Sequence, residues 1–134
     1  MTTPIVDQPD PVHTGRRPTW DIVMSYVQQR LPAEMATLVL VDMRDRDLVG
    51  RERYGTPLTS HNGRDHLVDA YQEILDSVVY LANELDEHGA DPETRVDLSI
   101  PVHLRKRLTV VQQLFASQIR TLIEVRQLIE ERLS

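Results

Sequence analysis

Acidic side chains recur at helical spacing in the segment DAYQEILDSVVYL, residues 69–81. At about 100° per residue, Asp69, Glu73 and Asp76 fall on one side of a helix. Tyr80 continues the same line one turn later. Most other positions of the segment are apolar, so these carboxylates adjoin a surface suited to burial, where their mutual repulsion grows as the dielectric constant falls. The line is therefore a candidate site for a hard divalent cation, which prefers oxygen ligands.

A second acidic pair precedes this line in the segment VLVDMRDRDLVGRERYG, residues 39–55. Asp45 follows Asp42 three positions later, so the two lie on one side of a helix. Two antiparallel helices joined by a loop of about ten residues could bring this pair opposite Glu73 and Asp76. Four such carboxylates would hold one or two Mg²⁺ ions. The alternative is an exposed helix whose acids alternate with arginines.

Composition limits the classes of protein to which these acids can belong. The chain has 134 residues and a net charge of −6, and its longest basic run is 105–107. We therefore expect one domain and no nucleic-acid partner, because gripping a phosphate backbone requires a larger basic surface. The absence of cysteine excludes disulfides and thiolate metal sites. Without a leader or a membrane-length apolar run, we expect a cytoplasmic protein with no membrane partner.

Turn-forming residues divide the chain into helical segments, and no strand pattern competes with them. We expect an all-α bundle of about four helices, over residues 19–30, 33–54, 64–87 and 102–133. Residues 1–18 contain four prolines and are predicted to form a flexible N-terminal arm. Residues 19–134 would then form a single domain, in which 33–88 supply the metal-binding helix pair.

Two helix starts carry possible capping residues. Thr19 is predicted to cap the first helix. Asn62, followed by Asp65 three residues later, resembles a capping arrangement for the third helix.

The last helix has an apolar pattern of alternating four- and three-residue steps. Its members are Leu104, Leu108, Val111, Phe115, Leu122, Val125 and Ile129, with Gln118 as the single polar position. Such a pattern is typical of a helix that packs along a partner helix. Either the first helix of the same chain or a second copy could be that partner, and we expect a second copy, which would make the protein a homodimer or homotetramer.

The sequence EILDSVVYLANEL, residues 73–85, resembles the Glu-x-x-Asp helix of the all-α, MazG-like nucleoside triphosphate pyrophosphohydrolases. In that family an upstream acidic pair completes the metal site, and Asp42 and Asp45 lie at a suitable distance. The family usually has Glu at these upstream positions, whereas this chain has the shorter Asp. The segment 50–76 is also similar to small helical proteins of actinobacteria and their phages.

The resemblance implies Mg²⁺-dependent hydrolysis of a nucleoside or deoxynucleoside triphosphate to the monophosphate and pyrophosphate, with Mn²⁺ as a possible substitute. The implied catalytic residues are Glu73, Asp76 and Asp45. The implied metal ligands are Asp42, Asp45, Glu73, Asp76 and Asp69. The candidate substrate-binding residues are Arg44, Arg51, Arg64, Asn62, His61 and Tyr80. For Asn62 and His61 the alternative is a helix cap and a surface histidine.

A protein of another class fits the same sequence. A non-catalytic helical module could use its long last helix for assembly and present the acids as ordinary surface or as a nucleotide sensor. The exposure of Asp69, Glu73 and Asp76 distinguishes the two hypotheses, because the enzyme requires them in a cleft facing the upstream pair.

Overall fold

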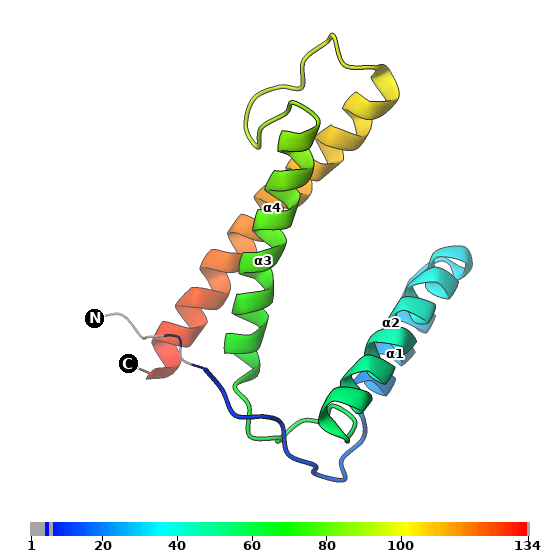
Figure 1. Cartoon of the computed structure of the whole chain (residues 1–134), viewed down its shortest axis with the longest axis vertical. Helices are drawn as coiled ribbons and strands as arrows, with labels where there is room; N and C mark the ends of the chain where they lie inside the picture. Colours follow the sequence, from blue (N-terminus) through cyan, green and yellow to red (C-terminus); the bar gives the residue numbers. More distant parts are fainter. Residues whose placement is uncertain (1–4, 6, 134) are drawn as a thin grey trace. The chain divides into compact units, whose positions relative to one another are not determined.

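The computed structural model describes residue 5 and residues 7–133, which contain four α-helices and no strand. The helices are α1 (Thr19–Arg30), α2 (Ala33–Tyr54), α3 (His66–Glu87) and α4 (Val102–Leu133), as Figure 1 shows. The all-α prediction is confirmed. The bounds of α1, α2 and α4 are those expected from the turn residues, and α3 begins two residues later than expected. No described helix combines the length and the apolar character needed to cross a membrane.

The contacts divide the chain into two compact units at the bond between Arg64 and Asp65. The first unit contains residues 7–64, with α1 and α2, and the second contains α3 and α4. The boundary falls inside the segment 33–88, for which a single metal-binding helix pair is predicted. That Asp42 and Asp45 face the acids of α3 stays a prediction.

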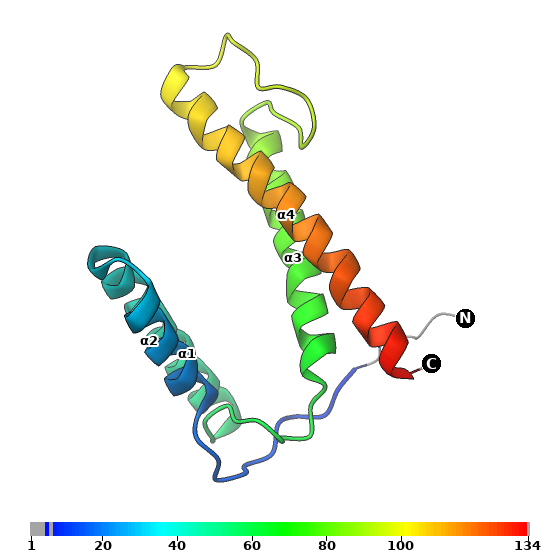
Figure 2. The ribbon, with the colours of Figure 1, turned by 180° about the vertical axis from the view of Figure 1, so that it is seen from behind.

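In the first unit, α1 and α2 form a hairpin joined by Leu31 and Pro32, and they lie side by side in Figures 1 and 2. Their contact buries Val27 and Ala36, each about 6% exposed. Thr19 does not cap α1 as predicted. Pro18 holds the capping position, and the backbone N–H of Thr19 donates instead to the carbonyl oxygen of Leu58 at 2.8 Å.

The loop after α2 is held by the residues that precede α1. The N–H of Val12 donates to the carbonyl oxygen of Asn62 at 2.9 Å, and the hydroxyls of Thr14 and Thr59 are 2.6 Å apart. His13 Nδ1 lies 2.6 Å from the hydroxyl of Thr56. The predicted arm thus has a hydrogen-bonded part within the described residues, whereas residues 1–4 and 6 lie outside them.

In the second unit, α3 and α4 form a long hairpin whose helices lie side by side in both views (Figures 1 and 2). Leu85, Val96 and Leu108 form a buried cluster at the connector end, and Ile129 is fully buried on α4. The alternating apolar pattern of α4 therefore packs against α3 of the same chain. It was expected to contact α1 or a second copy, so the pattern itself no longer supports a second copy.

Asp65 begins α3 and ties it to the end of α4. Its Oδ1 accepts hydrogen bonds from the N–H groups of Leu67 and Val68 at 3.1 and 3.2 Å, which makes Asp65 the N-cap. Its other carboxylate oxygen forms an ion pair with Arg132. The prediction that Asn62 helps to cap this helix is wrong, because Asp65 alone reaches the free N–H groups of the first turn.

The connector between α3 and α4 is held by hydrogen bonds from Gln112 and by the packing of Val96. The amide Nε2 of Gln112 donates to the carbonyl oxygens of Asp91 and Thr94, both at 2.8 Å. The carboxylate of Asp91 accepts from the N–H groups of Glu93 and Thr94, which closes a tight turn. The connector thereby places Val96 against the core formed by α3 and α4.

Candidate functional site

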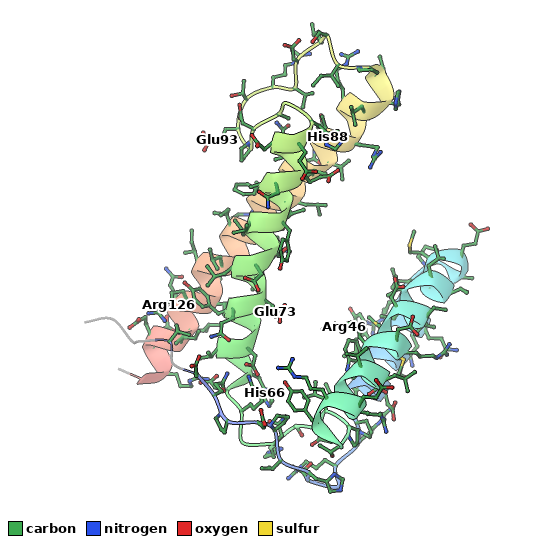
Figure 3. The ribbon with its side chains drawn as sticks, in the orientation of Figure 1. Arg46, His66, Glu73, His88, Glu93 and Arg126 are labelled. Atoms are coloured by element: carbon green, nitrogen blue, oxygen red, sulfur yellow. The ribbon has the colours of Figure 1, made fainter. Side chains whose placement is uncertain are left out.

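The acidic line of α3 faces away from α4. Leu85 and Val78 mark the side of α3 that packs on α4, and at about 100° per residue Glu73 and Asp76 lie on the opposite side. Figure 3 shows Glu73 midway along α3. Glu73 and Asp76 are exposed and Asp69 is half-buried. The hairpin itself therefore leaves the acidic line open.

The acidic pair of α2 likewise faces away from the other helix of its hairpin, α1. Ala36 is on the side of α2 that packs against α1, whereas Asp42 and Asp45 lie on the far side and are exposed. Asp47 is different, because its carboxylate forms an ion pair with Arg51 at 3.0 Å. The alternation of acids and arginines in α2 thus produces a local ion pair at Asp47.

The acids of the two predicted pairs have no basic side chain paired with them among the described residues. Among the described residues, none lies within ion-pairing distance of Asp42, Asp45, Glu73 or Asp76. Carboxylates spaced three residues apart repel each other on a helix. The two pairs therefore remain available to a cation.

Large apolar side chains accompany both acidic pairs. On α2, exposed aliphatic residues flank Asp45 on the same side of the helix, namely Leu38, Val41, Leu48 and Val49, which are 49–63% exposed. On α3, the acidic side adjoins Val79 and Tyr80, which are 56% and 68% exposed. An ordinary solvated helix face is dominated by polar residues, and contiguous exposed apolar surface marks a place where something binds.

Arg51 and Arg64, two of the predicted substrate ligands, have partners within the first unit. Arg51 pairs with Asp47, and the guanidinium of Arg64 donates to the carbonyl oxygen of Pro9 at 2.6 Å. Arg64 thereby holds the segment before α1. Arg44 is exposed and free of any such ion pair among the described residues.

Asn62 and His61 lie in the loop that ends at the unit boundary. Asn62 is 1% exposed, its Oδ1 accepts from the N–H of Arg64 at 3.2 Å, and its Nδ2 has no hydrogen-bond partner among the described residues. His61 is exposed and has a positive φ of 59°. Asn62 thus supports the loop from inside, whereas His61 and Tyr80 are accessible to a ligand.

The donor chemistry of the two pairs fits Mg²⁺. Within either unit, no three His, Asp or Glu side chains of the described residues gather closely enough to hold a metal ion. Mg²⁺ does not require such a cluster, because it is commonly bound by one or two carboxylates together with waters and substrate phosphates. One pair on a helix face therefore provides the number and type of protein ligands that this ion needs.

Hydrogen bonding lowers the pKa of three carboxyl groups, all outside the predicted metal ligands. Burial acts to raise the pKa of Asp65, but the hydrogen bonds from Val68 and Arg132 outweigh it, so the pKa falls below its usual value. In the connector, N–H groups of Thr94 and Ser99 lower the pKa of Asp91 and Asp97 respectively. These shifts mark the cap and the turns as structural carboxylates.

The sequence did not reveal a groove of about 480 Å³ at the start of α4. Its lining includes Arg95, Arg105 and Lys106. The basic run at 105–107 is visible in the sequence, but Arg95 lies ten residues earlier in an irregular connector, and no periodicity relates the two.

Comparison with known proteins returns no match for this chain among protein-family models, curated protein sequences or solved structures.

Proposed function

We propose that the chain is a Mg²⁺-dependent hydrolase that converts a nucleoside or deoxynucleoside triphosphate to the monophosphate and pyrophosphate. The observation that supports this proposal is the state of the two acidic pairs. Each pair lacks an ion-pair partner among the described residues and shares its helix face with large apolar side chains. Such a face excludes water once it is covered, which strengthens electrostatic interactions with a charged ligand.

The proposed roles follow from the chemistry of the side chains. Asp42, Asp45, Glu73 and Asp76, with Asp69, would hold Mg²⁺ or Mn²⁺, and this ion would polarise the phosphate oxygens and lower the pKa of a water bound to it. Glu73, Asp76 or Asp45 accepts the proton of the attacking water. One water is consumed, the oxygen bridge between the α- and β-phosphorus breaks, and pyrophosphate leaves.

Charge on the triphosphate requires cations beyond the metal ion. Of the three predicted arginines, Arg44 is the one that can approach a phosphate without giving up an ion pair, because it is exposed and near the acidic pair in the sequence. Arg51 and Arg64 would first release Asp47 and the carbonyl group of Pro9. Tyr80 and His61 offer exposed rings for the nucleobase.

We propose that the chain assembles as a homodimer or homotetramer. With its patterned side packed on α3, α4 still exposes Leu114 and Leu128. These two side chains are about half exposed and lie on one side of the helix, so they offer apolar surface to a further partner.

The decisive test replaces Glu73 by Gln, which keeps the shape of the side chain and removes its charge. Pyrophosphate release from a panel of nucleoside and deoxynucleoside triphosphates with Mg²⁺ should fall by about 100-fold or more, the usual contribution of a positioned acid or base. Asp86→Asn is the matched control, because Asp86 is an exposed acid of α3 outside the acidic line. An undiminished rate in Glu73→Gln would remove Glu73 from the mechanism.

The second candidate is a non-catalytic interaction module or nucleotide sensor. The exposure of Glu73 and Asp76 favours it, as does the absence of a three-ligand group within either unit among the described residues. The same panel separates the candidates. Triphosphate binding without pyrophosphate release identifies a sensor, and neither binding nor release identifies an interaction module.

A further inference from the structure

The groove at the start of α4 lies between the connector and the first turns of that helix. It is an open groove of about 480 Å³, and all of its lining residues belong to the second unit. Arg95 enters it from the connector, and Arg105 and Lys106 enter it from α4. No acidic residue lines it, although the chain as a whole has a net charge of −6. Three cations around one groove repel each other until an anion occupies it.

Arg105 also has a buried donor without an acceptor. Its side-chain Nε is closed to solvent and has no hydrogen-bond partner among the described residues. A buried N–H without an acceptor costs free energy, and a charged donor costs more than a neutral one. An anion in the groove would bind the outer N–H groups of the same guanidinium, because Nε itself is not accessible from the groove.

The remaining walls of the groove indicate the rest of the ligand. Leu98, Val102 and Val110 line it and are 53–68% exposed, so they offer apolar surface that nothing in the second unit covers. The positive end of the dipole of α4 lies at Val102 and adds to the attraction for an anion.

We propose that this groove binds a small organic phosphate, with the phosphate group against Arg95, Arg105 and Lys106 and the apolar body of the molecule against the aliphatic walls. Arginine favours phosphate because its planar donors match two oxygens at once. A ligand without an apolar body would leave half of the groove exposed to water.

This site is separate from the acidic line of the same chain and goes beyond the hydrolase proposed above. Leu85 marks the groove end of α3, because it packs with Val96 and Leu108. Glu73 lies twelve residues before Leu85, which is about 18 Å along a helix. Figure 3 shows this separation, with His88 and Glu93 at the connector end and Glu73 midway along α3. Binding in the groove therefore requires neither Mg²⁺ nor the acidic line.

The test measures binding of phenyl phosphate and inorganic phosphate to the full chain by titration calorimetry, without divalent cations. Phenyl phosphate should bind at least tenfold more tightly than inorganic phosphate. Arg105→Met, which keeps the length of the side chain, should weaken phenyl phosphate binding at least tenfold. Arg107→Met is the matched control, because Arg107 is an exposed neighbour on α4 outside the groove lining, and its affinity should stay within twofold of the native value.

Thermal unfolding distinguishes a loss of phosphate binding from a general loss of structure. Without phosphate, Arg105→Met should melt at or above the native temperature, because the unpaired buried donor is gone. With phenyl phosphate, the native protein should gain stability and Arg105→Met should not. If Arg105→Met does not fold, Arg95→Met, at an exposed connector position, serves instead and should weaken binding at least threefold.

Three results would overturn the proposal. The first is no saturable binding of phenyl phosphate to the native chain. The second is equal affinity in Arg105→Met and Arg107→Met. The third is loss of binding in Glu73→Gln, which would assign the phosphate to the acidic line.

Discussion

The two helical hairpins of this chain are stabilised in different ways. The α3–α4 hairpin buries Leu85, Leu108 and Ile129 almost completely, at 0–1% exposure. The α1–α2 hairpin has no apolar residue buried to that degree, and the most buried side chains of its unit are polar, Thr59 and Asn62. The α3–α4 hairpin therefore has an apolar cluster that is almost fully buried. Among the described residues, the first unit buries only Val27 and Ala36 between its helices, adds polar contacts in the loop after α2, and leaves most aliphatic residues of α2 exposed.

This difference indicates where the first unit can bind a ligand or a partner. Apolar surface that a hairpin cannot bury by itself is available to something else, and in α2 that surface surrounds Asp45. A face that is both aliphatic and acidic is poorly suited to water alone and well suited to a ligand that carries a cation.

Of the changes that test this difference between the hairpins, Leu108→Ala should have the largest effect on stability. It opens a cavity in the core of the α3–α4 hairpin, so the free energy of unfolding should fall by about 2–5 kcal/mol. Leu114→Ala, at a position 47% exposed on the same helix, should cost far less. Urea unfolding measures both, and equal losses would show that the buried cluster is not the main source of stability in this hairpin.

Thr59→Val tests the polar network of the other unit. The substitution keeps the shape and removes the hydrogen bond to Thr14, so stability should fall by about 1 kcal/mol. Amide hydrogen exchange at Val12, His13 and Thr14 should accelerate, because this bond helps to hold the segment before α1. Thr37→Val is the control, since the hydroxyl of Thr37 bonds only within α2. Unchanged exchange at Val12, His13 and Thr14 would contradict a role for the network in anchoring this segment.

Acidification should produce the smallest effect, and it acts on the α3–α4 hairpin. The folded-state pKa of Asp65 is lowered below 3.8, so its contribution to stability is present above that pH and is lost as pH falls through the folded value. Asp65→Asn removes the charge that pairs with Arg132 and should reduce the loss of stability between pH 5 and pH 2, a range of about three units around the ordinary carboxyl pKa. Chemical unfolding across this range provides the measurement. An identical pH dependence in both proteins would exclude the Asp65 carboxylate as a contributor.

Sequence patterns predicted the helices because strong local signals mark their ends. Pro32, Gly55 and Pro101 stop or start helices through backbone geometry alone, without regard to the rest of the fold. The capping residue of α3 was harder to predict, since Asn62 and Asp65 are both suitable by type. The choice between them depends on which side chain directly precedes the first free N–H groups.

The apolar periodicity of α4 could not predict which helix it packs against. The apolar pattern of α4 shows that the helix packs along another helix, but the same pattern serves α1, α3 or a second copy equally well. Helical spacing places the acids of each pair on one side of its helix, and α2 and α3 are helices as predicted. Whether the pairs on α2 and α3 serve one ion depends on contacts between distant parts of the chain, for which these two helices carry no local signal.

A single amide group joins the first turn of the connector to α4. Both N–H bonds of the Gln112 amide nitrogen point at main-chain oxygens, those of Asp91 and Thr94. Deamidation, or the substitution Gln112→Glu, would replace that nitrogen by an oxygen, and two attractions would become two repulsions. One chemical change of almost no volume would then release the turn at Asp91 and Thr94 from α4, while Val96 stays packed in the buried cluster. Arg95 lies between the released turn and that cluster, so its position in the groove depends on one glutamine.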